Sequence, residues 1–414
     1  MIQLRHMRQD IHGLVTASCG VLALGEPTHQ EHAFGWVRNE LLVQLADRGF
    51  RSVALETDRV AALRVNDFVQ GATGSLDAVM REGFSHGFGD LEHNRRLITW
   101  MRDRNENRPP GERLAFHGFD TPTENASAPS PRRYLEHVRD YLRLDLDLRH
   151  LLGDDERWSR TEAVMDPEAS IGATAEADSL LGIAEDMVTL LHARAPRPAE
   201  ATALAEWLRA KTHLYAGLGL LRYHRQSAER LDAGARLSRL LGVRDALMAE
   251  NLLDIRSTEA RRGPTLVFAH NLHLQHSRSA WSQGDMDVTW SGAGTVVGSL
   301  LGDQYTFVAG SLGRSGALGL EDPEPDTYEG SLQSRTDTWG LTTGTAVAPA
   351  RTRTDTHPRQ GYFPLDRSTL DAADAVLHIS DGAAVVTQAQ AQAQAQARAQ
   401  ARDGLRRPLL GGAV

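Results

Sequence analysis

Short apolar runs recur along the chain, and most of them are followed by a stretch with helical periodicity. The runs are too short for helices and end in polar residues, which is typical of buried strands in a parallel sheet. The expected strands are 21–24, 52–55, 114–116, 265–269 and 375–379. This alternation favours an α/β fold, with a mostly parallel sheet flanked by helices.

Two helices can be outlined from their periodicity and boundary residues. A core-facing side is expected from residues at three- and four-residue spacing, namely Phe34, Val37, Leu41 and Leu45. Gly49 follows this helix as a plausible stop signal. We expect Asp90 to cap a second helix, which runs through Trp100 and Met101 and ends before the Pro-Pro-Gly sequence at 109–111.

The sequence changes character between about residues 131 and 259. Leu, Ala, Arg and Glu dominate there at helical spacing, most clearly in 201–221 and 237–253. We therefore predict a helical insertion or cap between two halves of an α/β core. The expected organisation is 1–130 for the first half, 131–259 for the insertion, 260–385 for the second half and 386–414 for an Ala/Gln-rich tail.

The tail contains an Ala-Gln repeat with two arginines over 388–402. Its composition suits either a solvated helix or a flexible segment, because no apolar face is available to pack it. We expect it to be dispensable for chemistry.

Composition excludes several classes of protein. The chain has 54 acidic and 45 basic residues, for a net charge of -9, which argues against binding to nucleic acid through phosphate contacts. Cys19 is the only cysteine, so an internal disulfide and a Cys-based zinc site are excluded. The single lysine, Lys211, lies in a helical stretch without the Gly-rich loop of a nucleotide-binding P-loop. No apolar run approaches the ~20 residues of a membrane helix, and the first ten residues, MIQLRHMRQD, do not resemble the apolar region of a signal peptide. We expect a soluble cytoplasmic protein; the sequence does not predict its oligomeric state.

Ionisable side chains follow each of the first four expected strands. In chain order these positions carry Glu26 and His29, then Glu56, then His117 and Asp120, and finally His270, Asn271 and His273. Ligands of open α/β sheets bind outside the carboxyl ends of the strands. These residues are therefore expected to meet at one site.

Water activation by a histidine is the chemistry that these residues favour. Glu26 and Glu56 are expected to face each other, with Arg38 of the first helix as a charged partner. Such a cluster can orient His29 as the base that deprotonates water, while a histidine of 270–273 polarises or protonates the group that is cleaved. An ordinary ion pair that fixes the loop is the alternative role for Glu26 and Arg38.

A divalent metal site is a second use of the same residues. His29 and His32 are three residues apart, as are His270 and His273, and carboxylates stand nearby. Such a set can hold zinc with an open position for water. Neither pair lies in an H-E-x-x-H sequence, and pairs with this spacing arise often among 17 histidines. We therefore expect no cofactor and favour metal-free general-base catalysis.

A serine nucleophile is suggested by one motif. Residues 83–87 read GFSHG and fit G-x-S-x-G, but the preceding LDAVMRE is helical, whereas a nucleophile elbow follows a strand. We interpret Ser85 as a false positive. Cys19 has no adjacent basic residue and is expected to be an inert, buried thiol.

Ordered motifs along the chain resemble the erythromycin esterase family. The resemblance begins with GEPTHQEHAF, VRNELL and FRSVALE. It continues through RLITWMRDRN, LAFHGFD, RDALMAENLL and VFAHNLH, and covers about residues 14–379. It implies an α/β core with a helical insertion, and hydrolysis of a macrocyclic lactone ester by water activated on a histidine, without a covalent enzyme intermediate.

Carried over by position, the resemblance implies that His29 is the general base. Glu26, Arg38 and Glu56 would support it, with the histidines of 270–273 across the cleft. We expect contacts to a small natural-product substrate from four further residues, which are His32, His117, Asp120 and Asn271.

Three departures from the family pattern bear on the substrate. Gln30 follows His29 where the family usually has Gly, and His117 replaces an aromatic residue. The loop 85–90 contains Gly and His where relatives are rich in Trp. Macrolide resistance is therefore one possible role. A biosynthetic enzyme that closes a lactone or eliminates with the same base is another, and a relative that binds metal or haem without hydrolysis is a third.

Overall fold

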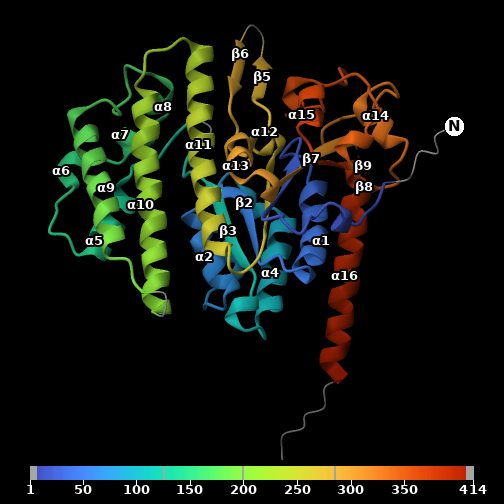
Figure 1. The fold of residues 1–414 in the computed structure, drawn as a ribbon, viewed down its shortest axis with the longest axis horizontal. Helices are drawn as coiled ribbons and strands as arrows, with labels where there is room; N and C mark the ends of the chain where they lie inside the picture. The colour runs from blue at the N-terminus through green and yellow to red at the C-terminus, as the bar shows by residue number, and fades with distance from the viewer. Residues whose placement is uncertain (1–6, 125, 198–199, 284–285, 407–414) are drawn as a thin grey trace, which may run out of the picture. The chain divides into compact units, whose positions relative to one another are not determined.

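The computed structural model describes residues 7–124, 126–197, 200–283 and 286–406 (Figure 1). Over these residues the fold is α/β, as expected from the alternation of apolar runs and helical stretches. The chain divides into two compact units. One comprises 1–14, 26–41 and 309–414, and the other 15–25 and 42–308.

A seven-stranded, mostly parallel sheet has the strand order β3-β2-β4-β1-β7-β9-β8. Its strands are β1 Val21–Glu26, β2 Ser52–Asp58, β3 Ala115–Asp120, β4 Thr265–His270, β7 Tyr305–Arg314, β8 Trp339–Thr343 and β9 Ala375–Asp381. β2 pairs in parallel with β3 and β4, β1 pairs in parallel with β7, and β8 is antiparallel to β9. A separate hairpin consists of β5 Ser279–Gln283 and β6 Met286–Trp290.

All five expected strands are present, and several are longer than expected. β2 and β3 continue to Asp58 and Asp120, which pair with each other beyond an irregularity in the register. The prediction that the ionisable residues of the expected site follow their strands is therefore wrong for five of them, which lie within the strands: Glu26, Glu56, His117, Asp120 and His270. A strand that is hydrogen-bonded to a neighbour can continue through polar residues, although the apolar run in the sequence ends before them.

Four strands are not among those expected from the sequence, namely β5, β6, β7 and β8. β7 is buried along almost its whole length next to β1. Its apolar residues alternate with Thr306, Gly310 and Ser311, small or polar residues that weaken the strand signal.

Helices α1 Ala33–Asp47, α2 Ala61–Val69, α3 Leu76–Glu82 and α4 Glu92–Asn105 accompany the first strands. The four apolar residues expected on one side of α1 are all buried, and Gly49 after it has a φ of +94°, which favours glycine. The expected cap at Asp90 is wrong. Asp90 ends a short 3₁₀ helix, and Leu91 precedes α4 without a side-chain capping bond.

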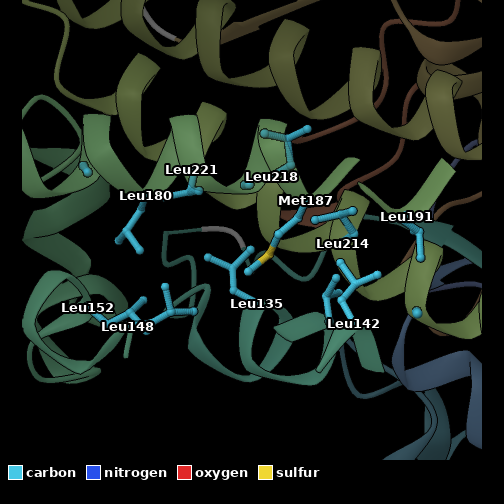
Figure 2. Close-up of a cluster of buried hydrophobic side chains, with 14 of the residues drawn as sticks. Leu135, Leu142, Leu148, Leu152, Leu180, Met187, Leu191, Leu214, Leu218 and Leu221 are labelled. Carbon is cyan, nitrogen blue, oxygen red and sulfur yellow. The ribbon is translucent and has the colours of Figure 1, made fainter. Parts of the chain in front are cut away.

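The region 131–259 is helical. Its helices are α5 Arg132–Leu142, α6 Arg149–Leu152, α7 Glu156–Ser159, α8 Thr161–Met165, α9 Ala175–Ala193, α10 Ala201–Ser227 and α11 Ala233–Glu259. The expected helical stretches 201–221 and 237–253 lie within α10 and α11. α5, α9 and α10 run beside one another (Figure 1) and share a core of leucines (Figure 2), among them Leu135, Leu180 and Leu214. The leucine-rich spacing of this region therefore encodes a hydrophobic core of its own.

The remaining helices are α12 Asn271–Leu274, α13 Ala293–Leu301, α14 Tyr328–Gln333, α15 Arg367–Asp371 and α16 Gly382–Arg406. For the Ala-Gln repeat, the helical alternative is the one observed, within α16; the end of the tail, 407–414, lies outside the described residues. None of the described helices combines the length and the hydropathy needed to cross a bilayer.

Candidate active site

Glu26 and His29 form a carboxylate–histidine pair. Glu26 ends β1, and His29 lies three residues later in the loop before α1. The Nδ1 atom of His29 lies 2.7 Å from Glu26 Oε1, and the His29 side chain is 35% exposed. A carboxylate at Nδ1 holds the proton on that nitrogen, so Nε2 is the atom able to accept a proton from water. The pair thus has the arrangement expected of an oriented general base.

Arg38 lies on α1 and is almost completely buried. Its Nε and Nη2 atoms donate to Asn39 Oδ1 at 3.1 and 2.8 Å. Burial lowers the pKa of Arg38 to about 9, and the charge of Glu26 acts in the opposite direction. Arg38 therefore remains a cation at neutral pH and interacts electrostatically with Glu26, as predicted.

A buried cluster around Arg244 joins three elements of the second unit. Arg244, on α11, donates from Nε and Nη2 to the two oxygens of Asp120 at 3.0 and 2.5 Å, and Nη2 also donates to Glu56 Oε1 at 3.2 Å. Burial would raise the pKa of Asp120, but the charge of Arg244 and the hydrogen bonds from His86 and Arg244 together lower it. Burial would likewise lower the pKa of Arg244, and Asp120 and Glu56 together raise it. The cluster is thus a fixed pair of carboxylates around one cation.

His273 extends this cluster toward α12. Its Nδ1 lies 2.9 and 3.0 Å from the oxygens of Asp245, and its Nε2 lies 3.3 Å from Glu56 Oε1. Burial would lower the pKa of His273, but Asp245 and Glu56 raise it to about 10. His273 is therefore an imidazolium at neutral pH, and the 3.4 Å approach of its Nε2 to Arg244 joins two donors rather than a donor and an acceptor. Such a histidine can donate a proton or stabilise negative charge, but it cannot act as a base.

Asp245 holds His273 in place. Its carboxylate is fully buried and also accepts from the indole Nε1 of Trp290 and the backbone N–H of Ala293, each at 2.8 Å. Several donors and an adjacent cation hold this buried charge, which an isolated carboxylate could not maintain. Asp245 is therefore a positioning residue for His273.

His270 and Asn271 occupy the junction of β4 and α12. The backbone N–H of His270 donates to Glu56 Oε2 at 3.0 Å, and its ring Nδ1 accepts from Leu272 N at 3.2 Å. A neutral His270 therefore carries its proton on Nε2. Asn271 accounts for the absence of a side chain at Gly25, because a Cβ at that position would lie 2.1 Å from Asn271 Oδ1.

His86 is a member of the site that sequence reasoning missed. Its Nε2 lies 2.9 Å from Asp120 Oδ2 and its Nδ1 lies 2.7 Å from Glu124 Oε2. Burial lowers its pKa, but Asp120 more than compensates and the pKa is raised. The only signal was a histidine between glycines in the GFSHG loop, where His86 adopts a positive φ of 56°.

The neighbouring Ser85 has a structural role. Its Oγ atom accepts from Asp58 N at 2.9 Å and lies 3.2 Å from Thr57 Oγ1. The segment before it is helix α3 rather than a strand, so the interpretation of GFSHG as a false positive is confirmed. Cys19 is buried, as expected.

The other expected substrate residues are dispersed. His117 Nε2 lies 2.9 Å from Glu259, which is itself bound by Arg262 at 2.7 Å. His32 lies directly before α1, and its side chain is exposed. His117 is thus part of an ion-pair group separate from the Arg244 cluster, because its side chain leaves β3 within the strand.

Within the described part of the chain, no three His, Cys, Asp or Glu side chains are arranged to hold a metal ion. The carboxylates of the Arg244 cluster are instead bound to cationic side chains. The Glu26–His29 pair and the Arg244 cluster belong to different units. That they line one cleft therefore stays a prediction.

Comparison with known proteins identifies the family. A family model described as erythromycin esterase matches residues 45–403, which is most of the chain. The chain belongs to the erythromycin esterase family. A curated member, erythromycin esterase type II from Escherichia coli, is 25% identical over 317 residues, covering 75% of this chain and 73% of the relative.

Solved structures share the fold of this family member. A variant of the erythromycin esterase EreC in its open conformation has a TM-score of 0.62 at 19% identity, covering 91% of this chain and 97% of that one. A Bacillus cereus protein has a TM-score of 0.65 at 17% identity, covering 88% and 89%. A protein described as a succinoglycan biosynthesis protein gives 0.60 at 15% identity, with 88% of each chain covered. The family resemblance drawn from the motifs is confirmed.

Proposed function

We propose that this protein is an esterase that hydrolyses the lactone or ester bond of a macrolide-like natural product, with water activated by His29. The observation that carries the proposal is the 2.7 Å contact between His29 Nδ1 and Glu26, on a ring that is about one-third exposed. Membership of the erythromycin esterase family supports the choice of bond and of substrate class.

The proposed reaction needs no covalent enzyme intermediate. His29 Nε2 takes a proton from water as the water oxygen attacks the ester carbonyl carbon. The resulting imidazolium is stabilised by Glu26 and returns the proton to the leaving alkoxide, so that the products are a carboxylic acid and an alcohol.

Within its own unit, the Arg244 cluster holds two cations among the carboxylates of Asp120, Glu56 and Asp245, and we propose that these cations suit the binding of an oxyanion. Arg244 and the protonated His273 are the cations of the cluster, and a fixed cation in a water-poor environment stabilises a developing oxyanion. Burial and ion pairing hold both cations in place, so little reorganisation would be needed when an oxyanion binds.

Product analysis in ¹⁸O-labelled water tests the function. Erythromycin is incubated with an excess of enzyme for a single turnover, and the products are analysed by mass spectrometry. Direct attack by water predicts a ring-opened product that has gained one water and carries the heavy oxygen in its carboxylate. An unlabelled first product would instead mean that an enzyme carboxylate is the nucleophile.

Product mass and a separate chelation experiment test the alternative functions. A product that has lost water, or that has the mass of its substrate, would identify elimination or ring closure and would reject hydrolysis. Activity that disappears after chelation and returns with one added divalent ion would reject the metal-free mechanism while leaving hydrolysis intact.

A further inference from the structure

A cavity of about 400 Å³ lies between α10 and α11, in the unit that also contains the Arg244 cluster. Lys211, Tyr215 and Ala216 line it from α10, and Leu247 and Asp254 line it from α11. Arg59, which follows β2, and Thr121, which follows β3, also contribute. A volume of this size is typical of small-molecule sites, and the position beyond the ends of two parallel strands is one that open α/β sheets use for ligands.

The cavity is lined by three cations, Arg59, Lys211 and Arg222, and by three anions, Asp120, Glu250 and Asp254, with Arg222 paired to Glu250. Arg59 and Lys211 both donate to the carboxylate of Asp254, so two positive side chains share one negative one. All three are largely buried, with side-chain exposures of 12%, 21% and 24%. Asp120 also reaches the wall, but it is fully buried and its charge is bound by Arg244 and His86. Within this wall, the group of Arg59, Lys211 and Asp254 therefore has one more cation than anions.

Lys211 has hydrogen-bonding capacity that this trio does not use. An ammonium group has three hydrogens, and Asp254 is the single acceptor bound to Lys211 Nζ among the described residues. The rings of Trp207 and Tyr215 have centroids 5.7 and 5.8 Å from Nζ and accept no conventional hydrogen bond. A partly buried ammonium with free hydrogens, next to an arginine that shares the same single carboxylate, is suited to binding an anion.

The rest of the lining indicates what the anion is attached to. Tyr215, Ala216 and Leu247 present ring and aliphatic surface to the cavity. Such surface contributes affinity only when the ligand has an apolar body to bury. A bare inorganic anion would leave this part of the cavity without a partner.

We propose that the α10–α11 cavity is a binding site for a small organic carboxylate, with the carboxylate held by Lys211 and Arg59 and the apolar body lying against Tyr215 and Leu247. These four residues lie outside the Glu26–His29 pair and the Arg244 cluster, although Asp120 of that cluster also lines the cavity.

Acylation of the single lysine provides the test. Full-length protein is treated with an amine-acetylating reagent in the presence and absence of benzoate, and peptide mass spectrometry measures the acetylation of Lys211, with the terminal amino group as the internal reference. At a benzoate concentration ten times its dissociation constant, labelling of Lys211 should slow about tenfold while the reference is unaffected. Equal protection by inorganic phosphate would overturn the assignment of an organic ligand.

Two sets of variants distinguish specific binding at Lys211 from a general effect of positive charge in the cavity. Lys211→Met should weaken benzoate binding, measured by calorimetry, about tenfold or more, whereas Lys211→Arg should retain most of it. Arg222, a cation of the same cavity that pairs with Glu250 at 3.7 Å, supplies the matched control. Arg222→Met should change the affinity by less than about twofold. Unaltered binding to Lys211→Met, or an equal loss in Arg222→Met, would reject the proposal, whatever the outcome of the esterase assays.

Discussion

Asp245→Asn is the most informative single change in the Arg244 cluster, because it removes a charge while keeping the shape of the side chain. The carboxylate is fully buried and accepts from His273, from Trp290 Nε1 and from the backbone of Ala293. The amide oxygen of asparagine can still accept a hydrogen bond from some of these three donors. The loss of the electrostatic interaction with the His273 cation therefore dominates the effect.

The size of the effect follows from the pKa of His273. A pKa raised from 6.5 to about 10 corresponds to about 5 kcal/mol of preference for the imidazolium in the folded state. Asp245 and Glu56 share this effect, and Asp245 makes the larger contribution. Since breaking a buried ion pair usually costs 3–5 kcal/mol, we expect the free energy of unfolding to fall by about 3 kcal/mol near pH 7.

The pH dependence has a defined sign. The pKa of His273 is higher in the folded state than in the unfolded state, so its protonation stabilises the fold fully below pH 6.5. This stabilisation is lost as the pH rises through about 10. The difference in stability between wild type and Asp245→Asn should therefore be large near pH 7 and shrink as the pH approaches and passes 10.

Urea unfolding followed by tryptophan fluorescence measures this difference at several pH values. Asp287→Asn, an exposed aspartate on β6, is the matched control and should change stability by less than about 0.5 kcal/mol. A cost for Asp245→Asn below about 1 kcal/mol would contradict the role given to this residue. So would a cost that is the same at pH 7 and above pH 10.

Two further substitutions test the packing of the fold by urea unfolding. Leu214→Ala empties a fully buried position of the helical core and should cost about 2–5 kcal/mol, while the 66% exposed Leu300→Ala should cost less than about 0.5 kcal/mol; equal costs would refute the core shown in Figure 2. Gly25→Ala places a Cβ 2.1 Å from Asn271 Oδ1 and should destabilise by about 1–3 kcal/mol; a neutral effect would show that the two segments are not in close contact.

The part of the site that follows from parallel strands could be predicted from the sequence. β2 pairs with β4 from Ser52 and Thr265 to Leu55 and Phe268. This register brings the next residues, Glu56 on one strand and the 269–270 segment on the other, side by side. The hydrogen bond from His270 N to Glu56 is its direct result. The end of an apolar run was thus a useful signal for Glu56 and His270, whereas the same signal also selected His117, which lies in a separate ion-pair group.

The site residues on helices and loops were harder to predict from the sequence. Arg244 and Asp245 lie inside the long helix α11, where an adjacent Arg and Asp have the same pattern as exposed surface charges. Their burial depends on strands and a hairpin distant in sequence. The RDALMAENLL motif pointed to the family but not to their chemistry. His86 was missed for a similar reason, because it lies in a loop and its partner Asp120 is at the end of strand β3, distant in sequence.

The strand β7 shows the limit of apolar periodicity. Its neighbours supply hydrogen bonds that hold Gly310 and Ser311 in a strand, although neither residue favours one. The helical region is the opposite case, since local leucine spacing alone indicated α10 and α11.

The turnover of His29→Ala tests the central claim most directly, and His150→Ala is its control because that histidine is exposed on α6. With both variants folded as judged by circular dichroism, loss of the general base should reduce kcat for erythromycin hydrolysis by about 10²–10⁴-fold. The control should hydrolyse at the wild-type rate. Wild-type turnover by folded His29→Ala would contradict the account.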